Sequence, residues 1–227
     1  MNNLKINNEE QKTAIVTGAS EGIGAAFSKL LIKKGWKVIG ISRSSSKLRA
    51  ISQNLLSNEQ SFKYFSCDVQ DLKKLKNIAK EVEVPDLLLL NAGIYSPVNA
   101  SEINLDLYKK HLNINYLGVL NSYEAFLPGL IKKQNGHIII MSSVSGWIGL
   151  PKAAAYGPTK AALRSFAQSA RYDLNPKGIK VQLCSPGFVE TQATSINDFY
   201  MPGLMNVNEA ANLIFKYMGS NKFEFSF

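Results

Sequence analysis

Apolar residues along this 227-residue chain fall into short runs that alternate with longer stretches of helical spacing. A short apolar run between turn signals is typical of a buried strand, whereas apolar positions three and four residues apart indicate an amphipathic helix. Strands are therefore predicted at residues 13–16, 37–42, 61–67, 86–90, 137–141, 179–184 and 222–225. Helices are predicted between them at residues 25–34, 44–57, 71–83, 105–133, 154–174 and 208–218.

This alternation predicts an α/β fold, in which helices cover both faces of a parallel sheet. Crossovers in such sheets are right-handed, and ligands bind beyond the carboxyl ends of the strands. The sequence shows no internal repeat, low-complexity tract or linker. We therefore expect a single domain over residues 1–227.

The first predicted strand leads into a glycine-rich turn, Thr17–Gly24, with the sequence TGASEGIG. Gly18 suits the tight turn, and Gly22 and Gly24 let a phosphate and the strand approach the backbone closely. The helix that follows offers free N–H groups and the positive end of its dipole. The stretch indicates a pyrophosphate site, although glycine-rich turns also join strands to helices in proteins that bind no nucleotide.

The chain is basic, with 26 lysine and arginine residues, 17 aspartate and glutamate residues, and a formal net charge of +9. The lysines occur as scattered pairs on predicted helix surfaces, without the interleaved aromatic residues that a nucleic-acid stacking platform requires. We therefore expect solvated helix faces and no nucleic-acid partner. The positive field favours an anionic cofactor or substrate.

The longest apolar runs are only a few residues, which predicts no transmembrane helix and no membrane partner. The polar N-terminus lacks the apolar segment of a secretory signal. Cys67 and Cys184 lie in separate predicted strands, so reduced core thiols are expected rather than a disulfide. These features predict a cytoplasmic protein, and no metal site is predicted.

Chemically suggestive residues follow the ends of several predicted strands, namely Arg43, Asp68, Asn91, Ser143 and Pro186. The carboxyl ends of parallel strands meet at one edge of a sheet. We therefore expect these residues to converge with the glycine turn in one active site.

Tyr156 and Lys160 are four residues apart on a predicted helix, so their side chains share one face. A free phenol has a pKa of about 10, and a nearby ammonium lowers it. Tyr156 could then exchange a proton with a hydroxyl or carbonyl, while Ser143 holds the same oxygen. Taken alone, this tyrosine and lysine fit an ordinary helix-surface pair better.

Together, these motifs resemble the short-chain dehydrogenase/reductase family. The glycine turn, Asn91–Ala92–Gly93, Ser143, Tyr156–Lys160 and Pro186–Gly187 occur in the family's order and spacing, over about residues 12–191. The resemblance implies a doubly wound Rossmann-type sheet of about seven mostly parallel strands. It also implies hydride transfer between a nicotinamide and a small-molecule carbonyl or alcohol.

The resemblance also implies roles. Tyr156 resembles the general acid/base, Ser143 the donor to the substrate oxygen, and Lys160 the residue that binds the nicotinamide ribose and lowers the tyrosine pKa. Asn115 resembles the asparagine that holds a water in the proton relay, with Asn113 as a nearby competitor. Other residues match cofactor positions: Ser20 and Ile23 in the phosphate turn, Asp68 and Val69 beside the adenine, Asn91, Ala92 and Gly93 beside the adenosine ribose, and Pro186, Gly187, Val189 and Thr191 beside the nicotinamide carboxamide.

The second predicted strand bears on the choice of cofactor. An NAD-preferring site places an acidic residue at its end, where this chain has Ser42. Arg43 follows and can bind a 2′-phosphate through paired, charge-assisted bonds. Glu21 is a contrary sign, because many NADP-using relatives have a basic residue at that point of the glycine turn. We expect NADP(H) to be preferred, with NAD(H) as the alternative.

Two other functions compete with this interpretation. A catalytically silent nucleotide-binding regulator or scaffold could keep the same fold, but Tyr156 and Lys160 are both present. A sugar-nucleotide epimerase or dehydratase usually has a longer chain with a substantial C-terminal substrate domain.

Residues 192–207 form the expected substrate loop, either as an apolar lid or as a helix packed on the core. By resemblance, a homodimer or homotetramer is expected, built on the helices that hold Asn115 and Tyr156.

Overall fold

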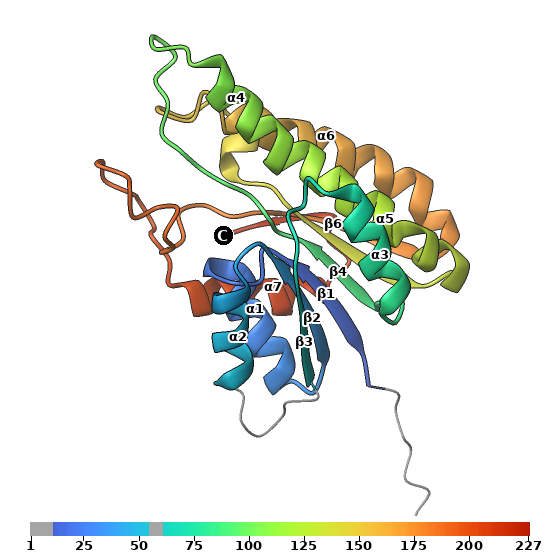
Figure 1. Cartoon of the computed structure of the whole chain (residues 1–227). Helices are drawn as coiled ribbons and strands as arrows, with labels where there is room; N and C mark the ends of the chain where they lie inside the picture. The colour runs from blue at the N-terminus through green and yellow to red at the C-terminus, as the bar shows by residue number, and fades with distance from the viewer. Residues whose placement is uncertain (1–10, 55–60) are drawn as a thin grey trace, which may run out of the picture.

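The computed structural model describes residues 11–54 and 61–227. Within these residues, seven parallel strands form one sheet in the order β3-β2-β1-β4-β5-β6-β7 (Figure 1). The strands are β1 (Thr13–Thr17), β2 (Lys37–Ser42), β3 (Phe62–Ser66), β4 (Leu87–Leu90), β5 (Gly136–Met141), β6 (Ile179–Ser185) and β7 (Glu224–Ser226). The expected doubly wound α/β fold is confirmed.

Helices cover both faces of this sheet. Figure 1 shows α3, α4, α5 and α6 over one face and α1, α2 and α7 over the other. The helices are α1 (Gly22–Lys33), α2 (Ser45–Gln53), α3 (Leu72–Glu81), α4 (Leu105–His111), α5 (Gly118–Lys133), α6 (Gly157–Leu174) and α7 (Val207–Met218). A π-helical segment, η2 (Leu112–Leu117), joins α4 to α5, and two 3-10 turns are η3 (Val144–Gly146) and η4 (Asn175–Lys177).

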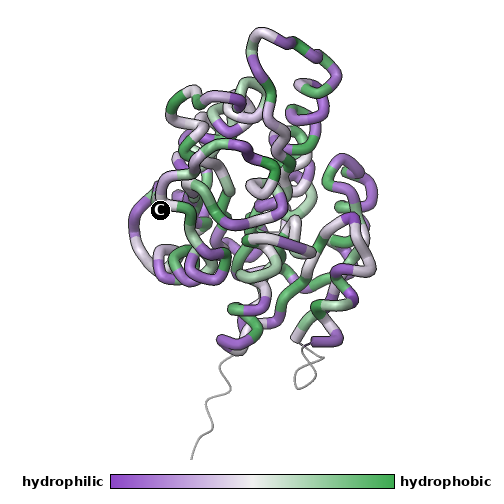
Figure 2. Tube along the Cα trace, turned by 90° about the vertical axis from the view of Figure 1, so that its left-hand side faces the viewer, coloured by the Kyte–Doolittle hydropathy of each residue, from purple (hydrophilic) through white to green (hydrophobic). Residues whose placement is uncertain are grey.

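The two helical layers bury separate apolar clusters against the sheet. One cluster packs α3, α5 and α6 on the strands and includes Leu75, Phe126 and Leu163, while the other packs α1, α2 and α7. The central strands are therefore buried on both faces, which explains their nearly continuous apolar runs. Hydrophobic and hydrophilic residues are interspersed along the chain (Figure 2). The hydrophobic residues of the helices pack in the two clusters against the sheet.

The structure differs from the expected boundaries in several places. The predicted helix over 105–133 is interrupted by η2, and the helix predicted from residue 154 begins at Gly157, with Pro158 in its first turn, where proline is tolerated. The helix predicted over 44–57 ends at Gln53, and residues 55–57 lie outside the described part of the chain. The last strand covers Glu224–Ser226 rather than 222–225.

The strand order sets the position of the site. β1 pairs with both β2 and β4, so the chain runs outward in one direction through β3 and then in the other from β4 to β7. Loops at the carboxyl ends of β1 and β4 separate at this reversal and leave room for a ligand. Among the described residues, no helix combines the length and apolar character needed to cross a membrane.

Candidate active site

A cavity of about 1010 Å³ lies at the carboxyl ends of the strands. It brings together the segments that follow β1 to β6 and the start of α6, as expected from a parallel sheet. The predicted site residues that line it are Gly18, Ser20, Gly22, Ile23, Arg43, Asp68, Val69, Asn91, Ala92, Gly93, Ser143, Tyr156, Lys160, Pro186, Gly187, Val189 and Thr191. Of the described site residues, Gly24 and Asn115 lie behind the lining instead.

The glycine turn is packed too closely to accept side chains. Gly18 has a φ of +67°, and a Cβ there would lie 2.8 Å from the side-chain nitrogen of Asn91. A Cβ on Gly24 would collide with the carbonyl oxygen of Gly18. Within the described part of the chain, no side chain caps the start of α1, so its first N–H groups are available to an anion.

Tyr156 stands at the N-terminal boundary of α6, and its ring makes an edge-to-face contact with Tyr95, with 5.3 Å between the ring centroids. Burial raises the pKa of the Tyr156 phenol to about 12, while its hydrogen bond with Ser143 acts in the opposite direction. Burial outweighs this hydrogen bond. The phenol is therefore protonated at neutral pH. That Lys160 lowers the pKa of Tyr156 stays a prediction.

Lys160 is buried one helical turn beyond Tyr156. Its Nζ donates a hydrogen bond of 2.8 Å to the carbonyl oxygen of Met141 and lies 5.5 Å from the centroid of the Tyr156 ring. Ser142 fixes the same turn of the helix, because its hydroxyl donates to the Lys160 carbonyl over 3.0 Å. Burial lowers the pKa of Lys160 to about 8, which brings loss of its charge close to neutral pH.

Ser143 follows β5 directly and is 8% exposed. Its Oγ accepts a hydrogen bond of 3.2 Å from the backbone N–H of Ser145 and lies 3.4 Å from the carbonyl oxygen of Pro186. Ser143 caps the N-terminus of η3, and this contact fixes the orientation of its hydroxyl. Ser143 and Tyr156 consequently reach the cavity from two different elements.

Asn115 is fully buried in η2, whereas Asn113 is exposed, so the geometry favours Asn115 as the structurally important residue of the two. The Asn115 Oδ1 accepts a 2.7 Å hydrogen bond from the N–H of Ile94. Its Nδ2 donates to the Ile94 carbonyl over 2.9 Å and to the Thr159 hydroxyl over 3.3 Å. These bonds hold the segment after β4 against α6. The water-holding role stays a prediction.

The opposite end of the cavity lies beyond β2 and β3. Arg43 is exposed at the rim, and Asp68 accepts a 2.9 Å hydrogen bond from the N–H of Gln70. Glu21 of the glycine turn forms an ion pair with Lys47 of α2. Lys47 lies five positions beyond the end of β2 and in no motif, so the sequence alone gives no signal for it.

The expected substrate loop contributes residues between 192 and 202 to the cavity lining. Residues 192–206 contain no helix, so the alternative of a core-packed helix is wrong. Phe199 packs edge-to-face on Phe188 with 5.9 Å between centroids, and Asp198 accepts a 2.7 Å hydrogen bond from Lys152. Tyr200 lines the cavity but is 86% exposed. The described residues hold no cluster of histidine, cysteine, aspartate or glutamate suited to a metal ion.

Tyr95 is a second cavity residue that the sequence analysis missed. It follows Asn91–Ala92–Gly93 after β4, so its place just beyond a strand end was a usable signal. Both cysteines are buried and free, and Cys67 lies just past β3 rather than inside it.

Comparison with known proteins finds a matching family and related sequences. A family model described as short chain dehydrogenase matches residues 12–198. An uncharacterized oxidoreductase of Myxococcus xanthus is 31% identical over 220 residues, which cover 95% of this chain and 87% of that protein. A 3-oxoacyl-acyl-carrier-protein reductase (FabG) of Vibrio harveyi is 35% identical over 193 residues, covering 84% of this chain and 79% of that protein.

Solved structures show the same fold. A short-chain dehydrogenase from Sphingobium yanoikuyae, solved in complex with NADPH, superposes with a TM-score of 0.87 at 22% identity, over 95% of this chain and 87% of that one. The family match spans the glycine turn, Ser143, Tyr156 and Lys160 together. The chain therefore belongs to the short-chain dehydrogenase/reductase family and is an oxidoreductase of that family.

Proposed function

We propose that this enzyme is an NADP(H)-dependent reductase of small or medium-sized carbonyl compounds, with Tyr156 as the general acid/base. The observation that carries the proposal is the convergence of Ser143, Tyr156 and Lys160 on the cavity that the glycine turn also lines. A surface tyrosine–lysine pair would not share a cavity with an anion-binding turn.

The residues present fit a dinucleotide. The glycine turn excludes a Cβ at Gly18 and leaves the first N–H groups of α1 available, which suits a pyrophosphate. Lys160 would hold the ribose next to the nicotinamide, since its ammonium is buried beside Gly93 and Tyr156. Solved relatives with NADPH bound support the nicotinamide cofactor.

Bound NADPH supplies a hydride to the carbonyl carbon. The protein's part is to hold the carbonyl oxygen and give it a proton. The pKa of about 12 keeps Tyr156 protonated at neutral pH, so its hydroxyl can donate that proton. Ser143 would hydrogen-bond the same oxygen, and Asn115 would act as a positioning residue through Ile94 and Thr159.

The wall beyond Tyr156 is largely apolar and aromatic. Residues that supply it are Ile94, Tyr95, Leu150, Phe188, Phe199 and Tyr200. We propose that the substrate carries an apolar body next to its carbonyl group. A panel of aldehydes and ketones, followed by the loss of NADPH absorbance, tests this proposal. Turnover of small, charged keto acids alone would contradict it.

The cofactor preference leads to a prediction on β2. Ser42 brings no negative charge to the end of the strand, and Arg43 lines the cavity beside it. A charge-assisted bond contributes about 1.5–3 kcal/mol, so NADPH should bind roughly ten- to a hundredfold more tightly than NADH. Ser42→Asp combined with Arg43→Leu should reverse this order, because the new carboxylate repels a 2′-phosphate. Fluorescence titration with both cofactors measures the effect. Equal affinity of the unmodified enzyme for both would contradict the role of Arg43.

We also propose a homo-oligomer built on η2 and α6. These elements expose apolar side chains that a monomer leaves in water, namely Leu112, Leu117 and Tyr172 at 44%, 43% and 76% exposure. A second copy of this chain would cover them. Light scattering after size-exclusion chromatography is expected to give a dimer or tetramer, and Leu117→Glu to shift it toward the monomer. A wild-type monomer at high concentration would contradict this assembly.

A further inference from the structure

We propose that Lys47 is a cofactor-specificity residue, which neutralises Glu21 and so lets the site accept the 2′-phosphate of NADP(H). This inference rests on the proposed use of NADP(H). It assigns a role to a residue that lies outside every motif of the sequence.

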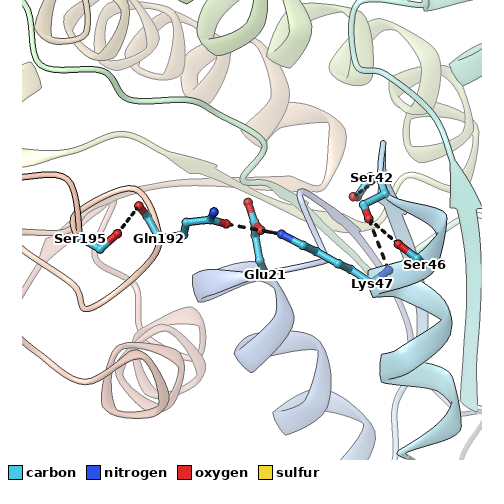
Figure 3. Close-up of polar contacts among 7 residues, drawn as sticks. Glu21, Ser42, Ser46, Lys47, Gln192 and Ser195 are labelled. Carbon is cyan, nitrogen blue, oxygen red and sulfur yellow. Dashed lines mark hydrogen bonds and ion pairs between the residues drawn. The ribbon is translucent and has the colours of Figure 1, made fainter.

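Lys47 bridges three segments that are far apart in the chain. It projects from the first turn of α2, forms an ion pair with Glu21 of the glycine turn, and lies 3.4 Å from the side-chain oxygen of Gln192 (Figure 3). Both partners of the ion pair are half exposed, at 50% and 52% of their side chains. Glu21, Lys47 and Gln192 all line the cavity.

The bridge lies where Arg43 would meet a 2′-phosphate. Ser42 ends β2, and the hydroxyl of Ser44 accepts a hydrogen bond from the backbone N–H of Lys47. Arg43 and Lys47 therefore both lie just beyond the end of this strand. The hydroxyls of Ser44 and Ser46 lie 3.2 Å apart on that short stretch. The start of α2 thus presents the Ser44 hydroxyl and the Lys47 ammonium on the side of the cavity that Arg43 lines.

Charge explains why Lys47 matters there. The charged side chains that line this end of the cavity are Arg43 and Lys47, with positive charge, and Glu21 and Asp68, with negative charge. Without Lys47, two carboxylates would face a phosphate that only Arg43 attracts. An unpaired Glu21 would repel the 2′-phosphate, whereas NADH, which lacks that group, would be affected much less.

The pair NADPH and NADH isolates the effect, since these molecules differ only in the 2′-phosphate. Dissociation constants are measured by fluorescence titration for the wild type, Lys47→Gln, Glu21→Gln, the double variant and Arg49→Gln. Arg49 is the matched control, because it is an exposed basic residue on α2 that does not line the cavity. Its exchange for glutamine removes the same charge. Thermal unfolding of each variant checks that the fold is intact.

Lys47→Gln should weaken NADPH binding about three- to fivefold, the upper scale of an exposed charge interaction, and leave NADH binding nearly unchanged. The double variant should recover NADPH affinity to within about twofold of the wild type, since the repelling carboxylate is gone. Glu21→Gln alone should strengthen NADPH binding, because Lys47 is released toward the phosphate. Arg49→Gln should bind both cofactors as the wild type does.

Three results would overturn the inference: equal weakening of both cofactors by Lys47→Gln, the same loss in Arg49→Gln, or no recovery in the double variant. A wild type that prefers NADPH while Lys47→Gln keeps the full preference overturns the role of Lys47 alone. A wild type that binds NADH as tightly as NADPH overturns the proposed cofactor choice, and this inference with it.

Discussion

Replacing Tyr156 with phenylalanine is expected to lower carbonyl reduction by at least ~10²-fold, the usual scale for the loss of a general acid. The ring stays, so its edge-to-face contact with Tyr95 is preserved, and only the hydroxyl is removed. Steady-state loss of NADPH absorbance with a carbonyl substrate measures the rate. NADPH affinity should survive, because the glycine turn proposed to bind its pyrophosphate lies on other elements.

Tyr95→Phe is the matched control, since Tyr95 also lines the cavity and loses the same hydroxyl in this exchange. Its reduction rate should stay close to that of the wild type. If Tyr156→Phe reduced carbonyl substrates at nearly the full rate, the proton would have to come from another group and the proposed mechanism would fail. A comparable loss in both variants would point to packing of the two rings rather than proton donation.

Lys160→Met should weaken NADPH binding about tenfold or more, because the buried ammonium that would hold the ribose is removed. Burial lowers the Lys160 pKa from 10.5 to about 8, so the side chain is charged below pH 8 and loses its charge as the pH rises through that value. The wild-type affinity for NADPH should therefore fall between about pH 7 and 9. In Lys160→Met, the weaker affinity should not change over the same range.

Lys177→Met provides the control, because it removes the same charge from an exposed lysine. Lys177 lies in η4, beyond the C-terminal end of α6, whereas Tyr156 lies at its N-terminal end. This variant should reproduce both the affinity and the pH profile of the wild type. Unchanged NADPH affinity in Lys160→Met, or an equal decline with pH in both Lys160→Met and the wild type, would exclude Lys160 from ribose binding. Titrations at constant ionic strength separate this effect from screening of the net charge.

Some features of this protein follow from the sequence alone. The spacing of apolar residues along the chain predicted the alternation of strands and helices. A strand buried on both faces must be apolar throughout, whereas a helix on the sheet needs only one apolar face. The parallel sheet then brought residues such as Arg43, Asn91 and Ser143 to one cavity, since carboxyl ends of parallel strands share an edge. Those positions could be predicted because each depends on a local pattern and on one general rule of topology.

Other features were decided only by the tertiary structure. Glu21 and Lys47 are 26 residues apart, and Asn115 and Ile94 are 21 apart, so no local pattern could pair them. The pKa of Tyr156 is raised because burial, which depends on the whole fold, outweighs the hydrogen bond with Ser143. The substrate loop has no helix because its apolar residues partly face the cavity and solvent instead of packing on the sheet. Spacing along the chain places side chains on a common edge, but desolvation and contacts between distant segments set their charge and their partners.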